Sequence, residues 1–303
     1  MRREEVGMKK VGVIGLGDMG SGLARNLVKA GFETAGFDLR EDRLAALSEM
    51  GGRPAASPAT VAKTSDAVFV MVLNGQQAKD VVFGADGLVS GFKPGSTVIL
   101  TATIKPSEAR EIADGLKKHD IHLIDAPVSG GYPGAQAGTL TMMAAGAPEV
   151  LDVHQPILEA VGEKIFRVGA NAGDGQTVKA CLQALIGSIF TATFEAAVLG
   201  AKSGISGQVL YDVFSASGAG NNITRNAYGK ILDRAFVGTG SHIGTMYKDL
   251  TITMDHAREF GVPMFTTAAA MQLFQSGITR FPGEDNWAVT KILEEIVGAT
   301  VTR

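Results

Sequence analysis

The chain has 303 residues, of which 45% are hydrophobic and 19% are charged, and its formal net charge is −3. This length fits two domains, and the composition supplies enough apolar side chains for packed cores. The charge balance shows no basic stripe or acidic tail, so we expect neither a nucleic-acid nor a membrane partner. The single cysteine, Cys181, excludes an internal disulfide and argues against a cysteine-ligated metal site.

The first half of the chain alternates short apolar runs with amphipathic segments. The apolar runs predict buried strands at 11–15, 34–38, 67–73, 96–100, 122–126, 141–145 and 164–168. The segments between them predict helices at 19–30, 41–50, 76–83, 107–118 and 149–160. This repetition predicts an α/β domain with a Rossmann-type, doubly wound parallel sheet.

The strand signals stop near residue 170. A long helical pattern at 176–203 has no proline, and further helical stretches follow at 206–216, 224–233, 243–260, 264–276 and 285–298. We therefore expect an α/β domain over 1–170 and an all-helical domain over 171–303, joined by the long helix.

The window 184–201 is apolar and about long enough to cross a membrane. It contains Glu195 and is flanked by Lys179 and Lys202, so we expect a buried helix instead. The charged start, residues 1–10, lacks the apolar run of a signal peptide, and the expected location is the cytoplasm.

A G-x-G-x-x-G pattern directly follows the first predicted strand and opens the first predicted helix. Such a turn lets a pyrophosphate approach the backbone at a helix N-terminus. The expected cofactor-binding residues of this turn are Gly15, Leu16, Gly17, Asp18, Met19 and Gly20.

An acidic residue, Asp38, ends the second predicted strand, close to the ~20 residues expected between this turn and the acid that binds the adenosine ribose. Its carboxylate would repel a 2′-phosphate and so favours NAD over NADP. Arg40 is expected to be a solvated charge at a helix start, although it could meet a phosphate and keeps NADP possible.

The sequence Asp125-Ala-Pro-Val-Ser-Gly-Gly131 follows the strand predicted at 122–126. In open α/β sheets, ligands lie at the carboxyl ends of the strands. The hydroxyl of Ser129 and the N–H groups of Gly130 and Gly131 suit a carboxylate. A plain turn is the alternative, and Asp125 could equally accept hydrogen bonds from nearby N–H groups.

The long helix opens with Gly173-Asp-Gly-Gln-Thr-Val-Lys179. Lys179 and Gln183 are four residues apart and share one helix face. The positive end of the helix dipole and partial desolvation favour a neutral amine at Lys179, which a proton donor and acceptor at neutral pH requires. The alternative for a lysine at such a position is a surface residue.

Together these motifs resemble the β-hydroxyacid dehydrogenase family, which includes 3-hydroxyisobutyrate dehydrogenase, tartronate semialdehyde reductase and L-threonate dehydrogenase. The resemblance covers nearly the whole chain: GLGDMG matches the cofactor motif, DAPVSGG the substrate motif and GDGQTVK the catalytic motif. Lys248-Asp249-Leu250 looks like a fourth family segment.

The resemblance implies hydride transfer between nicotinamide and a small 2- or 3-hydroxy acid or semialdehyde. Lys179 would act as general acid or base, with Ser129, Gly130, Gly131 and Gln183 binding substrate. Asn74, Thr103 and Lys248 would contact the cofactor, although strand-end caps and a surface ion pair are the alternatives for these three. Asp285 lies where the family often has an acid near the substrate of a neighbouring subunit.

Departures from the family pattern leave the substrate open. Leu182 and Gln183 stand where asparagines are usual after the catalytic lysine, and Ala102 replaces a serine. A glutamine at 183 looks like the L-threonate dehydrogenase branch. Asn221 and Asn222 would suit a polyhydroxylated acid, unless they only cap a loop.

The histidines show no metal-ligand spacing, so no metal is expected. Trp287 is expected in a helical core. The helical domain should pack against a second copy as a homodimer or homotetramer. The open alternatives are a decarboxylating 6-phosphogluconate dehydrogenase, an imine reductase on the same scaffold, and a non-catalytic dinucleotide-binding redox sensor.

Overall fold

The computed structural model describes residues 10–303, and its contacts divide the chain into two compact units, Met1–Lys179 and Ala180–Arg303. The charged start on which the expectation of no signal peptide rests lies, up to residue 9, outside the described residues. The unit boundary falls inside the long helix α8 (Asp174–Lys202), whereas the sequence placed the change of character near residue 170. The first turn of α8 therefore packs with the α/β unit.

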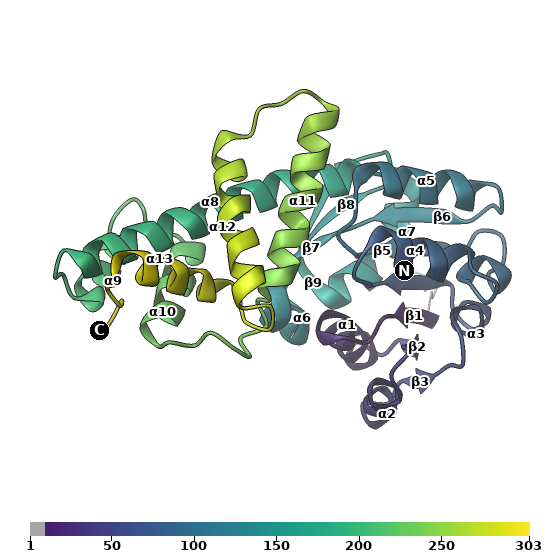
Figure 1. The fold of residues 1–303 in the computed structure, drawn as a ribbon. Coiled ribbons are helices and arrows are strands. Elements are labelled where there is room, and N and C mark those ends of the chain that lie inside the picture. The colour runs from purple at the N-terminus through teal and green to yellow at the C-terminus, as the bar shows by residue number, and fades with distance from the viewer. Residues whose placement is uncertain (1–9) are drawn as a thin grey trace, which may run out of the picture. The chain divides into compact units, whose positions relative to one another are not determined.

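The first unit contains a nine-stranded sheet with the order β3-β2-β1-β4-β5-β6-β8-β7, and β9 pairs with β8 (Figure 1). The strands are β1 (Lys10–Ile14), β2 (Glu33–Phe37), β3 (Arg53–Pro54), β4 (Ala67–Val70), β5 (Thr97–Leu100), β6 (His122–Asp125), β7 (Val128–Ser129), β8 (Leu140–Ala145) and β9 (Gly162–Gly169). The strand order runs one way from β1 to β3 and the other way from β4 onward. This switch point lies at the carboxyl end of β1, where α/β sheets bind ligands.

The expected Rossmann-type sheet is confirmed, with one local difference in direction. All pairings from β3 to β6 are parallel, and so is β8 with β9. β8 runs antiparallel to both β6 and β7. The chain returns after β7 through a short helix, α6 (Gly131–Ala137), that does not cross over the sheet, so β8 runs in the opposite direction.

Helices cover both faces of the sheet, as the strand patterns require. In β4 and β5, Phe69 and Ile99 belong to one buried cluster, and Val68 and Val98 belong to the other. The first cluster packs under α1 (Asp18–Lys29), α2 (Glu41–Glu49), α6 and α7 (Pro148–Val161). The second packs under α3 (Pro58–Lys63), α4 (Gly75–Phe83), the 3-10 turn Leu88–Ser90 and α5 (Pro106–Lys117). Burial of both faces explains the continuous apolar runs of these strands.

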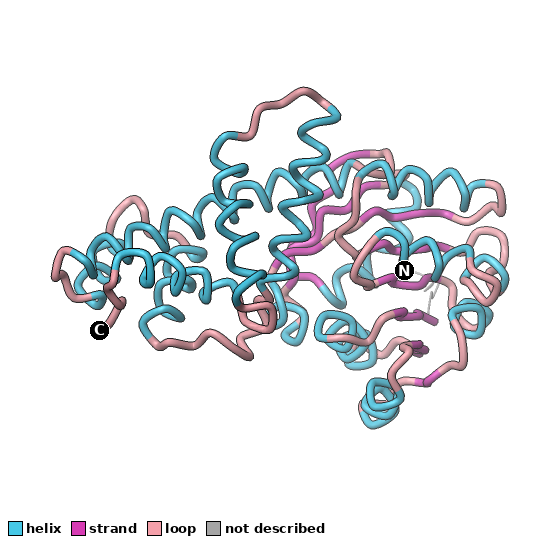
Figure 2. Tube along the Cα trace, in the orientation of Figure 1, coloured by secondary structure: helices cyan, strands magenta, loops and turns pink. Residues whose placement is uncertain are grey.

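The second unit is built from helices, as Figure 2 shows for Ala180–Arg303. After α8 come α9 (Gly207–Ala216), α10 (Asn222–Leu232), α11 (Ile243–Glu259), α12 (Phe265–Arg280), a 3-10 turn (Asn286–Ala288) and α13 (Val289–Val297). Phe190, Phe194 and Phe274 form its aromatic core, and Trp287 meets Phe190 edge-on with ring centroids 5.3 Å apart. Trp287 is 2% exposed, so its predicted place in the core is confirmed.

Helix α8 is long and apolar enough to cross a membrane, judged by length and composition alone, and it is the one such helix among the described residues. Within the protein, 44% of its most apolar window is buried. The core helices of globular proteins pass the same test, and α8 contributes Phe190 and Phe194 to a core of this kind.

Candidate active site

Three glycines shape the turn between β1 and α1, and they do so for different reasons. Gly15 has a φ of +85°, and a Cβ there would lie 2.2 Å from the carbonyl oxygen of Met71. A Cβ on Gly20 would lie 1.8 Å from the carbonyl oxygen of Gly15, so the backbone itself requires both glycines. Gly17 has a φ of −63°, and its Cβ would meet no protein atom within 4 Å. The open space above Gly17 is what a closely approaching pyrophosphate needs.

The start of α1 supplies hydrogen-bond donors toward that space. Gly17 is the N-cap residue and has no side chain to accept from the first N–H groups of the helix. Leu16 is buried in the core and anchors the turn, while Asp18 and Met19 form the first turn of the helix. The N–H groups and the positive dipole end at this N-terminus favour a bound phosphate.

Asp38 lies directly beside the glycine turn. Its Oδ2 accepts a hydrogen bond of 2.7 Å from the amide nitrogen of Leu16, and its Oδ1 accepts one of 3.0 Å from the amide nitrogen of Arg40. A carboxylate in this position can accept hydrogen bonds from ribose hydroxyls. The guanidinium of Arg40 pairs with Asp42 at 2.6 Å on the surface, as expected for a charge at a helix start.

The segment after β6 has the backbone of a ligand loop. Gly130 and Gly131 have φ values of +129° and +58°, which side chains other than glycine rarely adopt. Ser129 is half-buried at the end of β7, and both glycines are exposed where α6 begins. The hydroxyl and the backbone N–H groups of these three residues therefore come from consecutive positions of one tight turn.

The ammonium of Lys179 lies against this loop. Lys179 is 6% exposed, and its Nζ donates a hydrogen bond of 2.9 Å to the carbonyl oxygen of Val128. The side chain is therefore held beside the residue that precedes Ser129, and the alternative of a surface lysine is wrong.

Asp125 holds the start of α8 in place. Its Oδ2 accepts hydrogen bonds from the amide nitrogens of Gly173, at 2.8 Å, and Gln176, at 3.2 Å, while its Oδ1 accepts one from Nε2 of Gln176 at 2.8 Å. Burial raises the pKa of Asp125 to about 6, although these donors act in the opposite direction. Asp125 is thus an acceptor for nearby N–H groups, one of the two roles that the sequence allowed.

Two further residues predicted to contact the cofactor lie in loops after strands. Asn74 is the N-cap of α4, and its Oδ1 accepts from the amide nitrogen of Gln77 at 2.9 Å. Asn74 therefore has the capping role that the sequence analysis gave as its alternative. Thr103 is half-buried after β5, between Ala102 and Ile104, whose backbone groups both bond to the side chain of Gln176.

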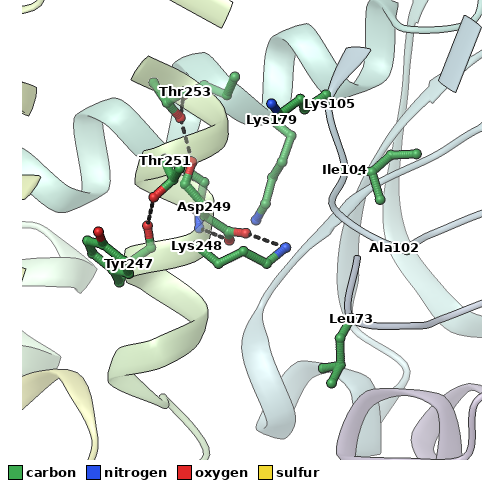
Figure 3. A network of polar contacts seen from close by, with 12 residues as sticks. Leu73, Ala102, Ile104, Lys105, Lys179, Tyr247, Lys248, Asp249, Thr251 and Thr253 are labelled. Carbon is green, nitrogen blue, oxygen red and sulfur yellow. Dashed lines mark hydrogen bonds and ion pairs between the residues drawn. The ribbon is translucent and has the colours of Figure 1, made fainter. Parts of the chain in front are cut away.

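In the second unit, Asp249 links two more of the predicted residues. Its Oδ2 accepts a hydrogen bond of 2.6 Å from Nε2 of Gln183, and its Oδ1 pairs with Nζ of Lys248 at 2.9 Å. Figure 3 shows Lys248 and Asp249 on α11, with Thr253 one turn farther along the helix. Gln183 and Asp249 are both buried. Because a carboxylate only accepts, Nε2 is the amide atom of Gln183 that faces Asp249.

The asparagines before and at the start of α10 have local partners. The Oδ1 of Asn221 accepts from the amide nitrogen of Thr224 at 3.0 Å as the N-cap of α10, and Asn222 accepts from Arg225. Asp285 is fully buried and accepts from the amide nitrogens of Thr239 and Ser241. The capping alternative therefore describes Asn221, and Asp285 stabilises a loop within its own unit.

Two family models together match nearly all of the described chain. The model for the NAD-binding domain of 6-phosphogluconate dehydrogenase matches residues 10–169, and the model for the NAD-binding domain of NADP-dependent 3-hydroxyisobutyrate dehydrogenase matches residues 173–293. An L-threonate dehydrogenase from Cupriavidus necator is 37% identical over 95% of this chain and 97% of its own length. Another from Escherichia coli K12 is 37% identical over 94% of this chain and 95% of its own length.

The chain belongs to the β-hydroxyacid dehydrogenase family. A solved structure of a 3-hydroxyisobutyrate dehydrogenase from Salmonella typhimurium has a TM-score of 0.86 and 35% sequence identity, and it covers 93% of this chain and 99% of its own. Like its relatives, this β-hydroxyacid dehydrogenase is an oxidoreductase that acts on a hydroxy acid and binds NAD(P).

Gln176 is part of the GDGQTVK motif, but the sequence alone predicted no role for it. In this dehydrogenase it is 1% exposed, and its side chain bonds to two other segments of the α/β unit. A signal was present, because Gln176, Lys179 and Gln183 follow a helical i, i+3, i+7 spacing on an otherwise apolar helix. Polar residues at this spacing share one face.

Proposed function

We propose that this dehydrogenase oxidises a small 2- or 3-hydroxy acid with NAD, and that a sugar acid of four carbons, such as L-threonate, is its substrate. The observation that carries the proposal is the buried amino group of Lys179 at the carbonyl oxygen of Val128, next to Ser129. A proton-transfer group and a loop suited to a carboxylate thus occur side by side within one unit.

Lys179 is the proposed general base in oxidation and general acid in reduction. Bound NAD would supply the hydride acceptor for the carbon that carries the hydroxyl group of the substrate. The hydroxyl proton passes to the neutral amine of Lys179, which becomes an ammonium as the carbonyl group of the product forms. In the reverse direction the ammonium returns this proton to the reduced oxygen.

The turn at Ser129, Gly130 and Gly131 is the proposed carboxylate site. Two consecutive backbone N–H groups and a hydroxyl supply donors for an anion without a cationic side chain. This requirement excludes simple alcohols and favours hydroxy acids.

The proposed cofactor site begins at the glycine turn, where the open position at Gly17 and the N–H donors of α1 fit a pyrophosphate. Asp38 would accept from the adenosine ribose, and its charge favours NAD over NADP. Asn74, Thr103 and Lys248 are the other proposed cofactor contacts.

The amide of Gln183 supports the choice of a hydroxylated substrate. Nε2 donates to Asp249, which leaves Oε1 as the acceptor that Gln183 can offer to a substrate. An acceptor in that position favours a second hydroxyl group over a branched apolar group. The likeness to two L-threonate dehydrogenases supports the same choice.

A homodimer or homotetramer is part of the proposal. Leu185 and Leu199 on α8 and Val209 and Val213 on α9 are exposed, although each is a large apolar side chain. Size-exclusion chromatography with light scattering should give a mass of two or four chains, and a monomer at micromolar concentration would contradict this part.

The experiment that tests the proposed function is a substrate panel. We expect NAD reduction with L-threonate and a lower kcat/KM with 3-hydroxyisobutyrate, which lacks the second hydroxyl group. Gln183→Leu, which removes the acceptor, should reduce this preference by roughly tenfold, because one hydrogen bond to a substrate hydroxyl is worth about 1 kcal/mol or more. Absence of turnover with every hydroxy acid and semialdehyde would contradict the proposal and favour a redox sensor.

A further inference from the structure

The side chain of Gln176 connects three separate segments of the α/β unit. Its Oε1 accepts a hydrogen bond of 3.1 Å from the amide nitrogen of Ile104, and its Nε2 donates to the carbonyl oxygen of Ala102 at 3.0 Å. The same Nε2 donates to Oδ1 of Asp125 at 2.8 Å. Gln176 itself lies on α8, so the 102–104 segment and the end of β6 are both bonded to the helix that carries Lys179.

The two backbone contacts have the geometry of a strand neighbour. A residue in a neighbouring parallel strand would bond to the carbonyl of one residue and to the N–H group two positions later. The amide of Gln176 does the same with Ala102 and Ile104, and Thr103 lies between these two bonds. Since one amide atom is an acceptor and the other a donor, only one orientation of the side chain satisfies all three contacts.

Asp125, at the end of β6, accepts hydrogen bonds from both the start of α8 and the side chain of Gln176. Its Oδ2 accepts from the amide nitrogens of Gly173 and Gln176, so the helix start and the glutamine side chain share one carboxylate. Gln176 and Lys179 are three residues apart and lie on the same face of α8. Figure 3 shows Ala102 and Ile104 on one segment and Lys179 on the helix beside it.

We propose that Gln176 is a positioning residue that fixes the Thr103 segment relative to Lys179, so that the cofactor contact and the proton-transfer group keep one geometry. This inference rests on the proposed function for the roles of Thr103 and Lys179. Gln176 is 1% exposed and bonds to the backbone on either side of Thr103, so we assign it an indirect role through that segment.

The first test is Gln176→Met, which keeps the length of the side chain and removes its hydrogen bonds. We expect faster amide hydrogen exchange at Ile104, a dissociation constant for NADH raised by roughly tenfold, and a lower kcat. Gln155→Met on α7 is the matched control, because Gln155 bonds to Glu159 and Arg167 away from this network. The control should leave all three measurements unchanged.

The second test is Gln176→Glu, in which the side chain at position 176 can donate a hydrogen bond only when its carboxyl group is protonated. A glutamate can still accept from Ile104, but it can donate to Ala102 or Asp125 only as the neutral acid. Among the described charged residues, Asp125 bonds to the side chain of Gln176, Lys179 shares its helix face, and Arg110 lies beside Gly173. We expect NADH binding close to wild type at acid pH and progressively weaker binding as the pH rises through neutrality.

The outcomes separate this inference from the proposed function. Unchanged NADH affinity and unchanged exchange at Ile104 in Gln176→Met would overturn the positioning role, whatever the substrate is. A lower Tm with unaltered NADH affinity would also overturn it and leave only a structural role. If the wild-type protein turns over no hydroxy acid, the proposed function fails, while NADH titration and hydrogen exchange still decide the role of Gln176.

Discussion

The ammonium of Lys179 donates a hydrogen bond to the carbonyl oxygen of Val128 across 2.9 Å, and Val128 immediately precedes Ser129. This contact connects strand β7 with the first turns of α8 through the side chain that we propose as the proton-transfer group. The contact holds the amino group of Lys179 beside the loop that carries Ser129.

Replacement of this lysine tests its chemical role directly. Lys179→Ala should lower kcat by ~100-fold or more, because the variant lacks a general base. Lys179→Arg should not restore activity, since a guanidinium stays protonated. Steady-state kinetics with NAD and the best hydroxy acid measure the effect, and NADH titration of both variants serves as the control. Activity close to wild type in Lys179→Ala would remove this residue from the mechanism.

The glycine turn predicts opposite results for two alanine substitutions. Gly17→Ala should leave Tm almost unchanged, because its Cβ meets no protein atom and its φ of −63° suits alanine. It should weaken NADH binding by tenfold or more, since the methyl group occupies the space assigned to the pyrophosphate. Gly20→Ala should lower Tm instead, because its Cβ would lie 1.8 Å from the carbonyl oxygen of Gly15. Thermal unfolding and NADH titration of both variants would separate the two effects, and normal affinity in Gly17→Ala would contradict the assignment.

Asp38 should control the choice between the two nicotinamide cofactors. Asp38→Asn keeps an oxygen that can accept from Leu16 and removes the charge that repels a 2′-phosphate. The ratio of kcat/KM for NAD to that for NADP should therefore fall by at least tenfold. Glu41→Gln, an exposed acid at the start of α2, is the matched control. A wild-type enzyme that already prefers NADPH would show that Asp38 does not have this role.

The buried carboxyl group of Asp125 should make stability depend on pH. Burial raises its pKa from 3.8 to about 6, so between these values the folded state binds more protons than the unfolded state. The contribution of Asp125 to the free energy of unfolding is therefore most favourable below pH 3.8. This contribution is lost as the pH rises through about 6. This pKa shift corresponds to a change of about 3 kcal/mol in the free energy of unfolding.

The measurement is urea unfolding of the wild-type protein and of Asp125→Asn across this pH range. The variant should be less stable overall, because its amide nitrogen would face Nε2 of Gln176 or the N–H groups of α8. Its stability should nevertheless decline less as the pH rises from 4 to 7. Parallel curves for the two proteins would show that another group carries the titration.

Much of the fold followed from the sequence because both faces of the sheet are covered. Strands buried on both sides appear as continuous apolar runs, and β1, β4 and β5 begin within one residue of the predicted positions. The strand predicted at 67–73 continues three residues beyond the end of β4. Helix α6 was not predicted, because Gly130, Gly131, Pro133 and Gly134 are typical of a turn. That helix begins where Gly131 adopts a positive φ, and its packing against α1, not its helix propensity, holds it.

The sequence indicated candidate site residues that lie within motifs, but it did not indicate the contacts between residues far apart in the chain. Asp38, Lys179 and the Ser129 turn are local in sequence, so spacing alone could indicate them. The bonds of Gln176 to Ala102 and Ile104 join positions 74 and 72 residues apart, and no periodicity reports such contacts. The same holds for Gln183 and Asp249, which are 66 residues apart.

The N-terminal cap of α8 does not come from its own neighbourhood. Gly173 precedes the helix without a side chain, and the capping carboxylate belongs to Asp125, 48 residues earlier in the chain. As the polypeptide leaves the ribosome, β6 is therefore synthesised before the helix that it caps. A fragment that starts at residue 171 would lack this acceptor, and its first helical turn should fray until a sheet with an intact β6 is supplied.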